Sequence, residues 1–147
     1  IAMIRILGRP SSINLRKVLW TCHELGLQVQ HEPWGQGDLR LDSAEFLRLN
    51  PNAMVPVLVD GDFVLTESNA ICRYLAALHP DSTLLPQQAQ ARARVEQWMD
   101  WQATELNNAW RYAFMGLVRK SPHFQDAHAI ENRAIAESDT AVSGCIR

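Results

Sequence analysis

The most informative segment of the chain is residues 49–76, LNPNAMVPVLVDGDFVLTESNAICRYLA. It contains two short β-rich runs, residues 57–59 and 63–65, which are joined by an Asp-Gly-Asp turn. An Asp-Gly dipeptide between apolar runs is the strongest short-range signal for a β-hairpin. After the second run, Ser68 precedes apolar residues spaced by three and four, which is typical of an amphipathic helix. The segment therefore predicts two antiparallel strands followed by a helix.

The preceding part of the chain adds two strands and two helices to this prediction. Residues 3–7 form a short apolar run that ends in a loop, and the apolar positions of residues 13–25 recur with helical spacing. Residues 28–32 alternate polar and apolar side chains like a strand, and a short helix is expected at 43–49. We therefore predict a βαβαββα domain over residues 1–79.

The character of the sequence changes after this domain. Residues 80–86, PDSTLLP, interrupt the pattern and are typical of a linker. Beyond them no strand pattern remains: residues 87–120 predict one long amphipathic helix, and 123–142 a further, weakly apolar helix. The predicted fold class is thus α/β plus all-α, with a helical domain over residues 87–147.

Composition and charge argue against several classes of protein. The net charge of −2 gives no electrostatic drive toward nucleic acid, and no apolar run reaches the length of a membrane span. The N-terminus lacks the pattern of a signal peptide, so a cytoplasmic protein without membrane contact is expected. The histidines show no metal-ligand spacing, which predicts no metal site. Three widely separated cysteines predict reduced thiols: Cys22, Cys72 and Cys145.

Two serines stand at the junction between the first predicted strand and the first predicted helix. A helix start presents unpaired N–H groups and the positive end of the helix dipole. A hydroxyl of Ser11 or Ser12 at this point can therefore help to stabilise a bound anion such as a thiolate. Helix capping is the competing interpretation, because serine is among the commonest N-cap residues.

Two further junctions carry groups that can bind a ligand. Pro56 precedes the strand at 57–59, so it is expected at the first residue of a strand or at a sheet edge, where its peptide bond can be cis. An edge position would leave the main chain of Val55 free to pair with an extended peptide. At the next strand-to-helix junction, Ser68 with nearby amides can hold a carboxylate, and Glu67 can hold a cationic amine. An incidental strand-entry proline and a simple helix cap are the respective alternatives.

Together these features resemble the glutathione transferase family. Residues 9–27, RPSSINLRKVLWTCHELGL, look like the first strand-to-helix segment of the serine-type members, most like the phi class and related bacterial enzymes. Residues 49–76 resemble the family signature NP-x-x-x-VP-x-L followed by L-x-ES-x-AI-x-x-YL. Residues 96–107, EQWMDWQATELN, are similar to the start of the family's all-helical domain. The resemblance covers nearly all of residues 4–79.

The resemblance implies a thioredoxin-like domain that binds glutathione as a co-substrate. The thiolate would attack a small apolar electrophile whose identity the sequence does not specify. Ser12 is the residue implied to donate a hydrogen bond to the glutathione sulfur, with Ser11 and Asn14 as alternative donors.

The resemblance also assigns the rest of the tripeptide. The main chain of Val55, beside a cis Pro56, would pair with the cysteinyl unit, and Glu67 and Ser68 would hold the γ-glutamyl end.

Two departures from the family pattern concern this binding. Many members place a basic residue just before the second helix, whereas here Leu41 and Asp42 occupy that register. Either Arg40 substitutes and binds the glycine carboxylate, or this contact is missing. Met54 stands where many relatives have a polar residue.

The helical part supplies the remaining expectations. The apolar substrate would be bound between the domains by Trp110, Tyr112, Phe114 and Met115, with core packing as the competing role of Trp110 and Phe114. The resemblance implies a homodimer. Family members carry several helices beyond this point, so the helical domain is expected to be incomplete at Arg147, and the two residues before Met3 look like a short leader.

Two other functions stay open beside conjugation. One is a non-catalytic binding or regulatory protein with the glutathione transferase fold. The other is a glutathione-dependent disulfide or peroxide reductase. No cysteine lies at the first turn of the first predicted helix, which argues against a redox mechanism that uses a thiol of the protein.

Overall fold

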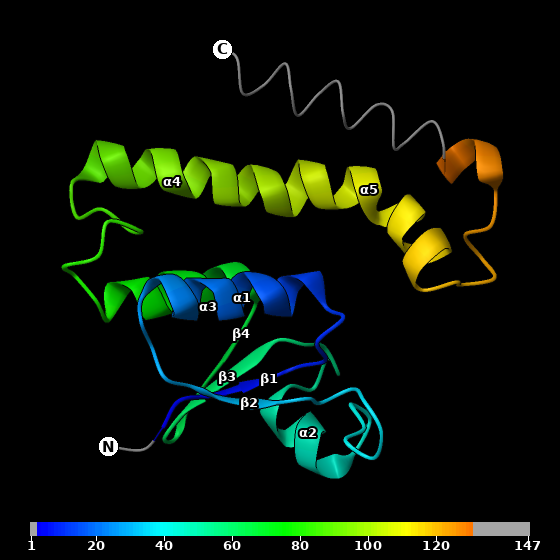
Figure 1. Ribbon diagram of the computed structural model, residues 1–147, viewed down its shortest axis with the longest axis horizontal. Coiled ribbons are helices and arrows are strands. Elements are labelled where there is room, and N and C mark those ends of the chain that lie inside the picture. Colours follow the sequence, from blue (N-terminus) through cyan, green and yellow to red (C-terminus); the bar gives the residue numbers. More distant parts are fainter. Residues whose placement is uncertain (1–2, 131–147) are drawn as a thin grey trace. The chain divides into compact units, whose positions relative to one another are not determined.

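The computed structural model describes residues 3–130 (Figure 1). The chain forms two compact units, and the boundary between them in the sequence lies between Arg92 and Ala93. The predicted domain limits, with a linker at 80–86, stay a prediction. Within the described residues, no helix combines the length and the apolar character that crossing a membrane requires.

The first unit contains a four-stranded sheet and three helices, in the predicted order. This βαβαββα arrangement is the thioredoxin-like fold and confirms the predicted class. The two N-terminal strands are shorter than predicted, because only their second halves pair with a neighbour. The elements are β1 (Arg5–Leu7), α1 (Ile13–Glu24), β2 (Gln30–Glu32), α2 (Ala44–Leu49), β3 (Val57–Asp60), β4 (Phe63–Thr66) and α3 (Ser68–Ala77).

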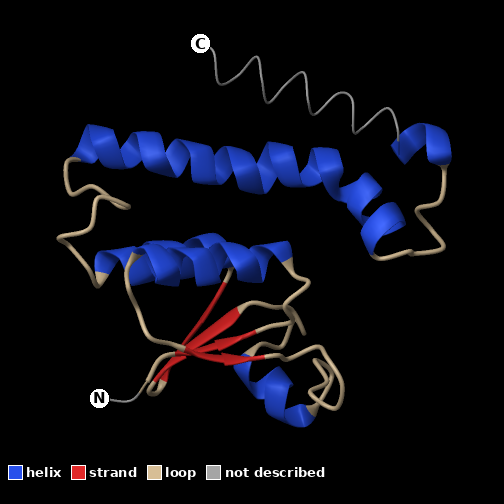
Figure 2. Ribbon diagram, in the orientation of Figure 1, coloured by secondary structure: helices blue, strands red, loops and turns tan. Residues whose placement is uncertain are grey.

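The strands lie in the order β2-β1-β3-β4 (Figure 2). β1 runs parallel to β2 and antiparallel to β3, and β4 returns antiparallel to β3. Asp60 pairs with Phe63, so the predicted hairpin turns through two residues. Gly61 has φ +59° in this turn, a conformation that glycine adopts without steric cost.

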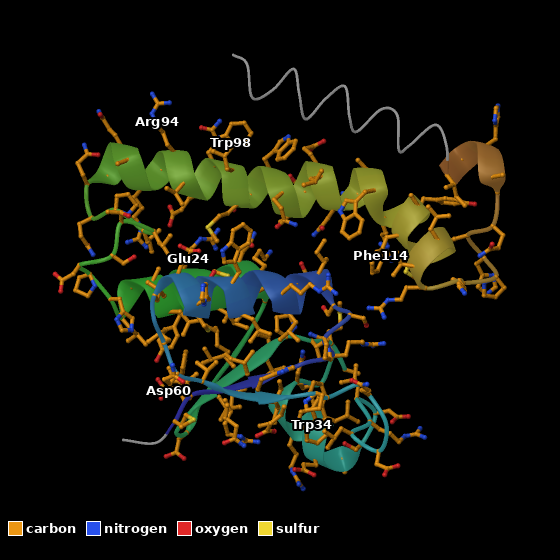
Figure 3. All side chains as sticks on the ribbon, viewed as in Figure 1. Glu24, Trp34, Asp60, Arg94, Trp98 and Phe114 are labelled. Carbon is orange, nitrogen blue, oxygen red and sulfur yellow. The ribbon has the colours of Figure 1, made fainter. Side chains whose placement is uncertain are left out.

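Apolar side chains cover both faces of the sheet. Successive residues of a strand point to opposite faces, so Leu7, Val57 and Val59 share one face. They pack there with Phe46 of α2 and with Trp34, whose ring centroid is 5.2 Å from that of Phe46 (Figure 3). α1 and α3 lie side by side against the other face (Figure 1).

Helices α1 and α3 are joined by buried and polar contacts. Cys22 and Cys72 are buried. Lys17 Nζ donates to Asn69 Oδ1 at 2.5 Å, and Thr21 donates to the Cys72 sulfur at 3.2 Å. These contacts hold the start of α3 against α1, and both helices begin at a candidate functional junction.

The second unit differs from the prediction in its helical geometry. The single helix expected at 87–120 contains two π-helical segments, each with i→i+5 hydrogen bonds. A π turn adds a residue within the same helical run, which apolar periodicity does not reveal. The segments are α4 (Ala89–Trp101), η1 (Gln102–Leu106), α5 (Asn107–Ala113) and η2 (Phe114–Val118). Of the helix predicted at 123–142, residues 127–130 are helical and the rest lies outside the described residues.

Candidate functional site

Ser12 is the N-cap residue of α1. Its φ and ψ of −81° and 120° are extended, and its Oγ accepts a hydrogen bond from the Leu15 N–H at 3.4 Å. The residue is only 8% exposed. Ser11, by contrast, is exposed, and Asn14 lies half-buried in the first turn. The capping interpretation is therefore confirmed for Ser12.

Capping does not use up the hydrogen-bonding capacity of the Ser12 hydroxyl. A hydroxyl has two lone pairs and one proton, so an oxygen that accepts from Leu15 can still donate its O–H. A thiolate placed at this helix start would accept a hydrogen bond from that O–H and would also lie at the positive end of the helix dipole. Capping and anion stabilisation are compatible roles for the same side chain.

The Val55–Pro56 peptide bond is cis, as the position of the proline before a strand suggested. The edge position expected for this proline is wrong, because the strand that follows it, β3, lies between β1 and β4; Pro56 instead stands directly before the first residue of that strand. Pro56 is buried, and within residues 3–130 the Val55 amide and carbonyl have no backbone hydrogen-bond partner. The loop before them is held by Asn50, whose Nδ2 donates to the Met54 carbonyl at 2.9 Å and whose Oδ1 accepts from the Asn52 N–H at 3.1 Å. The main chain of Val55 is thus presented by a fixed loop.

Asn50 had no role in the sequence-based prediction. Asparagine side chains commonly bond to a backbone N–H two residues further on, and an Asn directly after the helix predicted at 43–49 was the available signal for this turn.

The junction of β4 and α3 has a different geometry from the one expected. Glu67, not Ser68, occupies the N-cap position, and its side chain makes no capping hydrogen bond. Ser68 is the buried first residue of the helix. Glu67 has φ +68°, which costs a residue with a side chain about 1–3 kcal/mol. The simple helix cap is therefore wrong for Ser68, and the backbone turns the exposed Glu67 outward at the helix start.

The register of the sheet brings the three junctions together. Leu7, the last residue of β1, pairs with Val57, the first residue of β3, and Val57 pairs with Thr66, the last residue of β4. The segments that follow β1, precede β3 and follow β4 therefore all leave the sheet at the same end of its strands. The candidate site therefore combines a helix start, the Val55 main chain, which has no backbone partner in the described part of the chain, and a second helix start.

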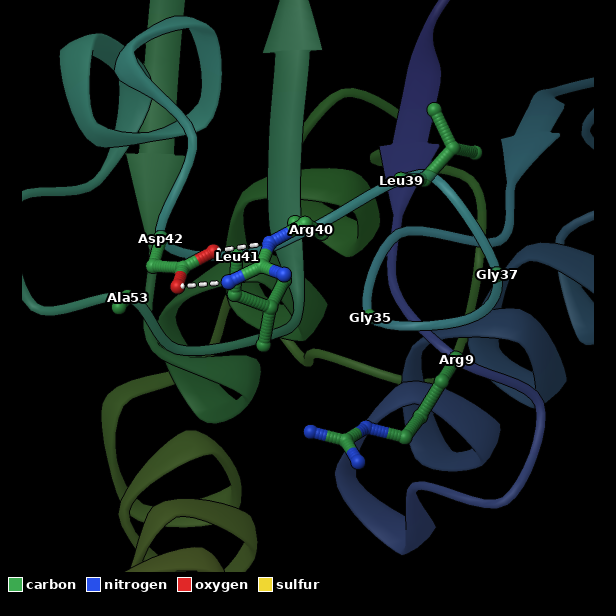
Figure 4. Close-up of a pocket in the computed structure, with 8 residues that line it drawn as sticks. All are labelled: Arg9, Gly35, Gly37, Leu39, Arg40, Leu41, Asp42 and Ala53. Carbon is green, nitrogen blue, oxygen red and sulfur yellow. Dashed lines mark hydrogen bonds and ion pairs between the residues drawn. The ribbon is translucent and has the colours of Figure 1, made fainter.

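A cavity of about 320 Å³ lies beside the loop before α2 and is lined by Arg9, Arg40 and Ala53 (Figure 4). Arg40 binds Asp42 through two hydrogen bonds, Nε to Oδ1 at 2.9 Å and Nη2 to Oδ2 at 2.6 Å. The hydrogen bond from Arg40 holds the pKa of the Asp42 carboxyl below its usual range. Met54, close in sequence to the cavity, is exposed.

Two of the four apolar candidates of the second unit contact each other. Trp110 and Phe114 meet edge to face with ring centroids 4.8 Å apart, and Tyr112 contacts Phe124 at 5.1 Å. Met115 is half-buried in η2. Aromatic contacts of this kind are typical of packing within a helical domain. Packing thus accounts for Trp110 and Phe114, and a role of the four residues in substrate binding stays a prediction.

The two described thiols are poor nucleophiles. Burial raises the pKa of Cys22 to about 11 and also raises the pKa of Cys72, so both thiols are protonated at neutral pH. Among residues 3–130, no group of three or more His, Cys, Asp or Glu side chains could hold a metal ion.

Comparisons with known proteins agree with this arrangement. Residues 7–83 match the family described as "Glutathione S-transferase, N-terminal domain". A curated relative, glutathione S-transferase GstB of Escherichia coli, is 44% identical over 131 residues, and the match covers 88% of this chain and 63% of that protein. Glutathione S-transferase 3 of Zea mays is 36% identical over 121 residues, covering 80% of this chain and 54% of that protein.

Solved structures show the same relationship. The crystal structure of a theta class glutathione S-transferase from Xanthomonas axonopodis pv. citri, with glutathione bound, matches with a TM-score of 0.87 and 35% identity. The match covers 98% of this chain and 69% of that chain, and the chain spans 63% of the length of the Escherichia coli relative. The fold, the family signature and these relatives lead to one conclusion: the chain belongs to the glutathione S-transferase family.

Proposed function

We propose that this protein is a glutathione transferase that conjugates the glutathione thiolate to a small apolar electrophile. The observation that carries the proposal is the end of the sheet at which the cap of α1, the main chain of Val55 and the start of α3 come together. Within one site, these three features offer a hydrogen-bond donor to the thiolate, a main chain that can pair with a peptide, and groups that can bind a charged terminus.

Glutathione would bind at this end of the sheet as an extended peptide. The main chain of Val55 pairs with the cysteinyl unit, as a strand edge pairs with an added strand. Ser68 and the amides at the start of α3 hold the γ-glutamyl carboxylate, and Glu67 holds the γ-glutamyl amine. This orientation directs the sulfur toward Ser12.

The energy needed to ionise the thiol is modest. A thiol with a pKa of about 8.5 is about 3% ionised at pH 7, and lowering its pKa by about two units needs about 2.7 kcal/mol of preferential stabilisation of the anion. A charge-assisted hydrogen bond is worth about 1.5–3 kcal/mol. The positive end of a helix adds about 0.3–1 kcal/mol. The Ser12 hydroxyl and the start of α1 are together sufficient.

Once the thiolate has formed, the main contribution of the protein is to position the thiolate and the electrophile next to each other. With an aryl halide as electrophile, the thiolate forms a C–S bond at the ring carbon, the C–halogen bond breaks and halide leaves. The thiol proton passes to solvent when glutathione binds. Holding both reactants in contact supplies most of the remaining rate enhancement. We assign the apolar lining to Trp110, Tyr112, Phe114 and Met115, and the protein to the cytoplasm as a homodimer.

Calorimetry with glutathione, followed by turnover assays of the same preparation, tests the proposal. Conjugation of an aryl halide at a rate above that of free glutathione is the expected result. Glutathione binding without turnover of any substrate would favour a non-catalytic binding or regulatory role. Faster turnover of a disulfide or peroxide than of the aryl halide would favour a glutathione-dependent reductase. No binding of glutathione would overturn the proposal.

A further inference from the structure

The cavity beside the loop before α2 is lined by two arginines, of which Arg40 is paired with Asp42 while Arg9 Nε has no acceptor among residues 3–130 (Figure 4). This matters if glutathione is the ligand, because the tripeptide has a carboxylate at each end. The γ-glutamyl carboxylate is already assigned to the start of α3. The glycine carboxylate still needs a cation, and the family position for it is occupied here by Leu41 and Asp42.

Arg40 is already engaged. Two hydrogen bonds join it to Asp42, and the two side chains are 70% and 65% exposed. To bind Arg40, a ligand carboxylate would have to displace the Asp42 carboxylate, which already accepts two hydrogen bonds from this guanidinium. Arg40 would also have to draw its guanidinium out of solvent, since its side chain is mostly exposed.

Arg9 is in the opposite situation. Its Nε is shielded from solvent, and no acceptor within residues 3–130 bonds to it. A charged donor that has lost its water without gaining a partner is unfavourable, so an anion that reaches it gains more than it would at an exposed arginine. In Figure 4 the dashed lines join Arg40 to Asp42, and none reaches Arg9.

The fold leaves space for this guanidinium. Gly35 has φ +87°, and a Cβ atom at that position would lie 3.2 Å from Arg9 Nε and 3.4 Å from the Leu41 side chain. A glycine is therefore needed both for the backbone conformation and for the close approach of the arginine. The loop before α2 and the end of β1 together form a slot around an unpartnered cation.

We propose that Arg9 binds the glycine carboxylate of glutathione in this protein, while Arg40 stays paired with Asp42. The proposal rests on the proposed function. Arg9 and Ser12 belong to the same connection between β1 and α1, and three residues span at most about 11 Å. The thiol and the glycine carboxylate belong to adjacent units of the tripeptide, so one connection can hold both. The planar guanidinium fits a carboxylate in a bidentate way that a lysine does not.

The test compares two ligands, glutathione and its glycine ethyl ester, which lacks the charge at that end alone. Dissociation constants are measured by calorimetry on the wild-type protein, Arg9→Met, Arg9→Lys and Arg40→Met. The ratio of the two constants within one variant does not depend on the fraction that is folded. We expect wild type to prefer glutathione by about tenfold or more, Arg9→Met to lose that preference, and Arg9→Lys to retain a smaller one.

Each outcome separates the two proposals. Equal affinities for both ligands in Arg9→Met, with the preference retained in Arg40→Met, would support the assignment. A wild-type preference that survives in Arg9→Met, or one that disappears in Arg40→Met, would overturn the role of Arg9 and leave the proposed function intact. Failure of the wild-type protein to bind either ligand would overturn the proposed function and the assignment with it.

Discussion

Replacing Ser12 by alanine tests the thiolate-stabilising role most directly. The substitution removes two things: the capping acceptor of the Leu15 N–H at 3.4 Å and the proposed donor to the sulfur. Loss of a charge-assisted hydrogen bond of about 1.5–3 kcal/mol raises the pKa of bound glutathione by about one to two units. From a bound pKa of about 6.5, the thiolate fraction and the conjugation rate at pH 7 then fall by about 3- to 25-fold, and the rate recovers at higher pH as the thiol ionises.

The matched control is Ser43→Ala. Ser43 caps α2 in the same way, with its Oγ accepting from the Phe46 N–H at 3.2 Å. Each substitution should lower the free energy of unfolding by about 0.5–2 kcal/mol through the lost cap. Only Ser12→Ala should change the ionisation of the thiol, because Ser43 lies at another helix start.

The assay is the pH dependence of conjugation, together with an ultraviolet titration of the bound thiolate. An apparent pKa that rises by one to two units in Ser12→Ala, with no change in Ser43→Ala, is expected. An unchanged apparent pKa in Ser12→Ala would refute the role of this hydroxyl. An equal loss of rate in both variants, without a pKa change, would show that the helix cap alone matters.

Three further predictions concern stability and reactivity. Phe46→Ala empties a fully buried site beside Trp34 and should lower the free energy of unfolding by about 3–5 kcal/mol, measured by urea denaturation; a loss below about 1 kcal/mol would contradict the packing. The hydrogen bond from Arg5 (Nε to Oε1, 2.7 Å) holds the pKa of Glu32 below its usual range, so its stabilisation is complete above the unfolded pKa of about 4.3 and is lost as the pH falls below it. The side chains of Arg5 and Glu32 are 37% and 18% exposed, so the pair is worth at most about 1 kcal/mol. Glu32→Gln should therefore make the free energy of unfolding slightly less dependent on pH in the acid range. An unchanged pH dependence would argue against the pair. Cys22, with its pKa raised to about 11, and Cys72 should be alkylated much more slowly in the native than in the urea-unfolded protein, as followed by peptide mass spectrometry; equal rates would contradict their burial.

Much of the first unit was predictable because its signals are local. The Asp-Gly turn, the alternation of residues 57–59 and the spacing of residues 13–25 each act within a few neighbours, and the structure contains the corresponding hairpin and helix. The second unit was less predictable. Its π-helical turns change the register of a helix without breaking it, and apolar spacing alone does not distinguish such a turn from a gap in the apolar stripe.

The junctions show the limit of local reasoning. A serine before a helix predicts a cap at both Ser12 and Ser68, yet only Ser12 is one. At the second junction the left-handed backbone of Glu67 moves the cap position back by one residue. That conformation is imposed by the connection from β4 into a helix packed on α1, and the sequence around it contains no glycine to announce it.

The sequence by itself determined the order of strands and helices, the hairpin and the family, because turn chemistry, periodicity and a signature all lie along the chain. Only the tertiary structure decided which groups meet. The pairing of Leu7 with Val57 and of Val57 with Thr66 brings three distant junctions to one end of the sheet. Within residues 3–130, Arg40 is paired with Asp42, whereas Arg9 Nε beside Gly35 is buried without an acceptor. These pairings depend on packing across the fold, which the sequence does not display, and for this reason we propose Arg9 in place of Arg40 as the carboxylate ligand.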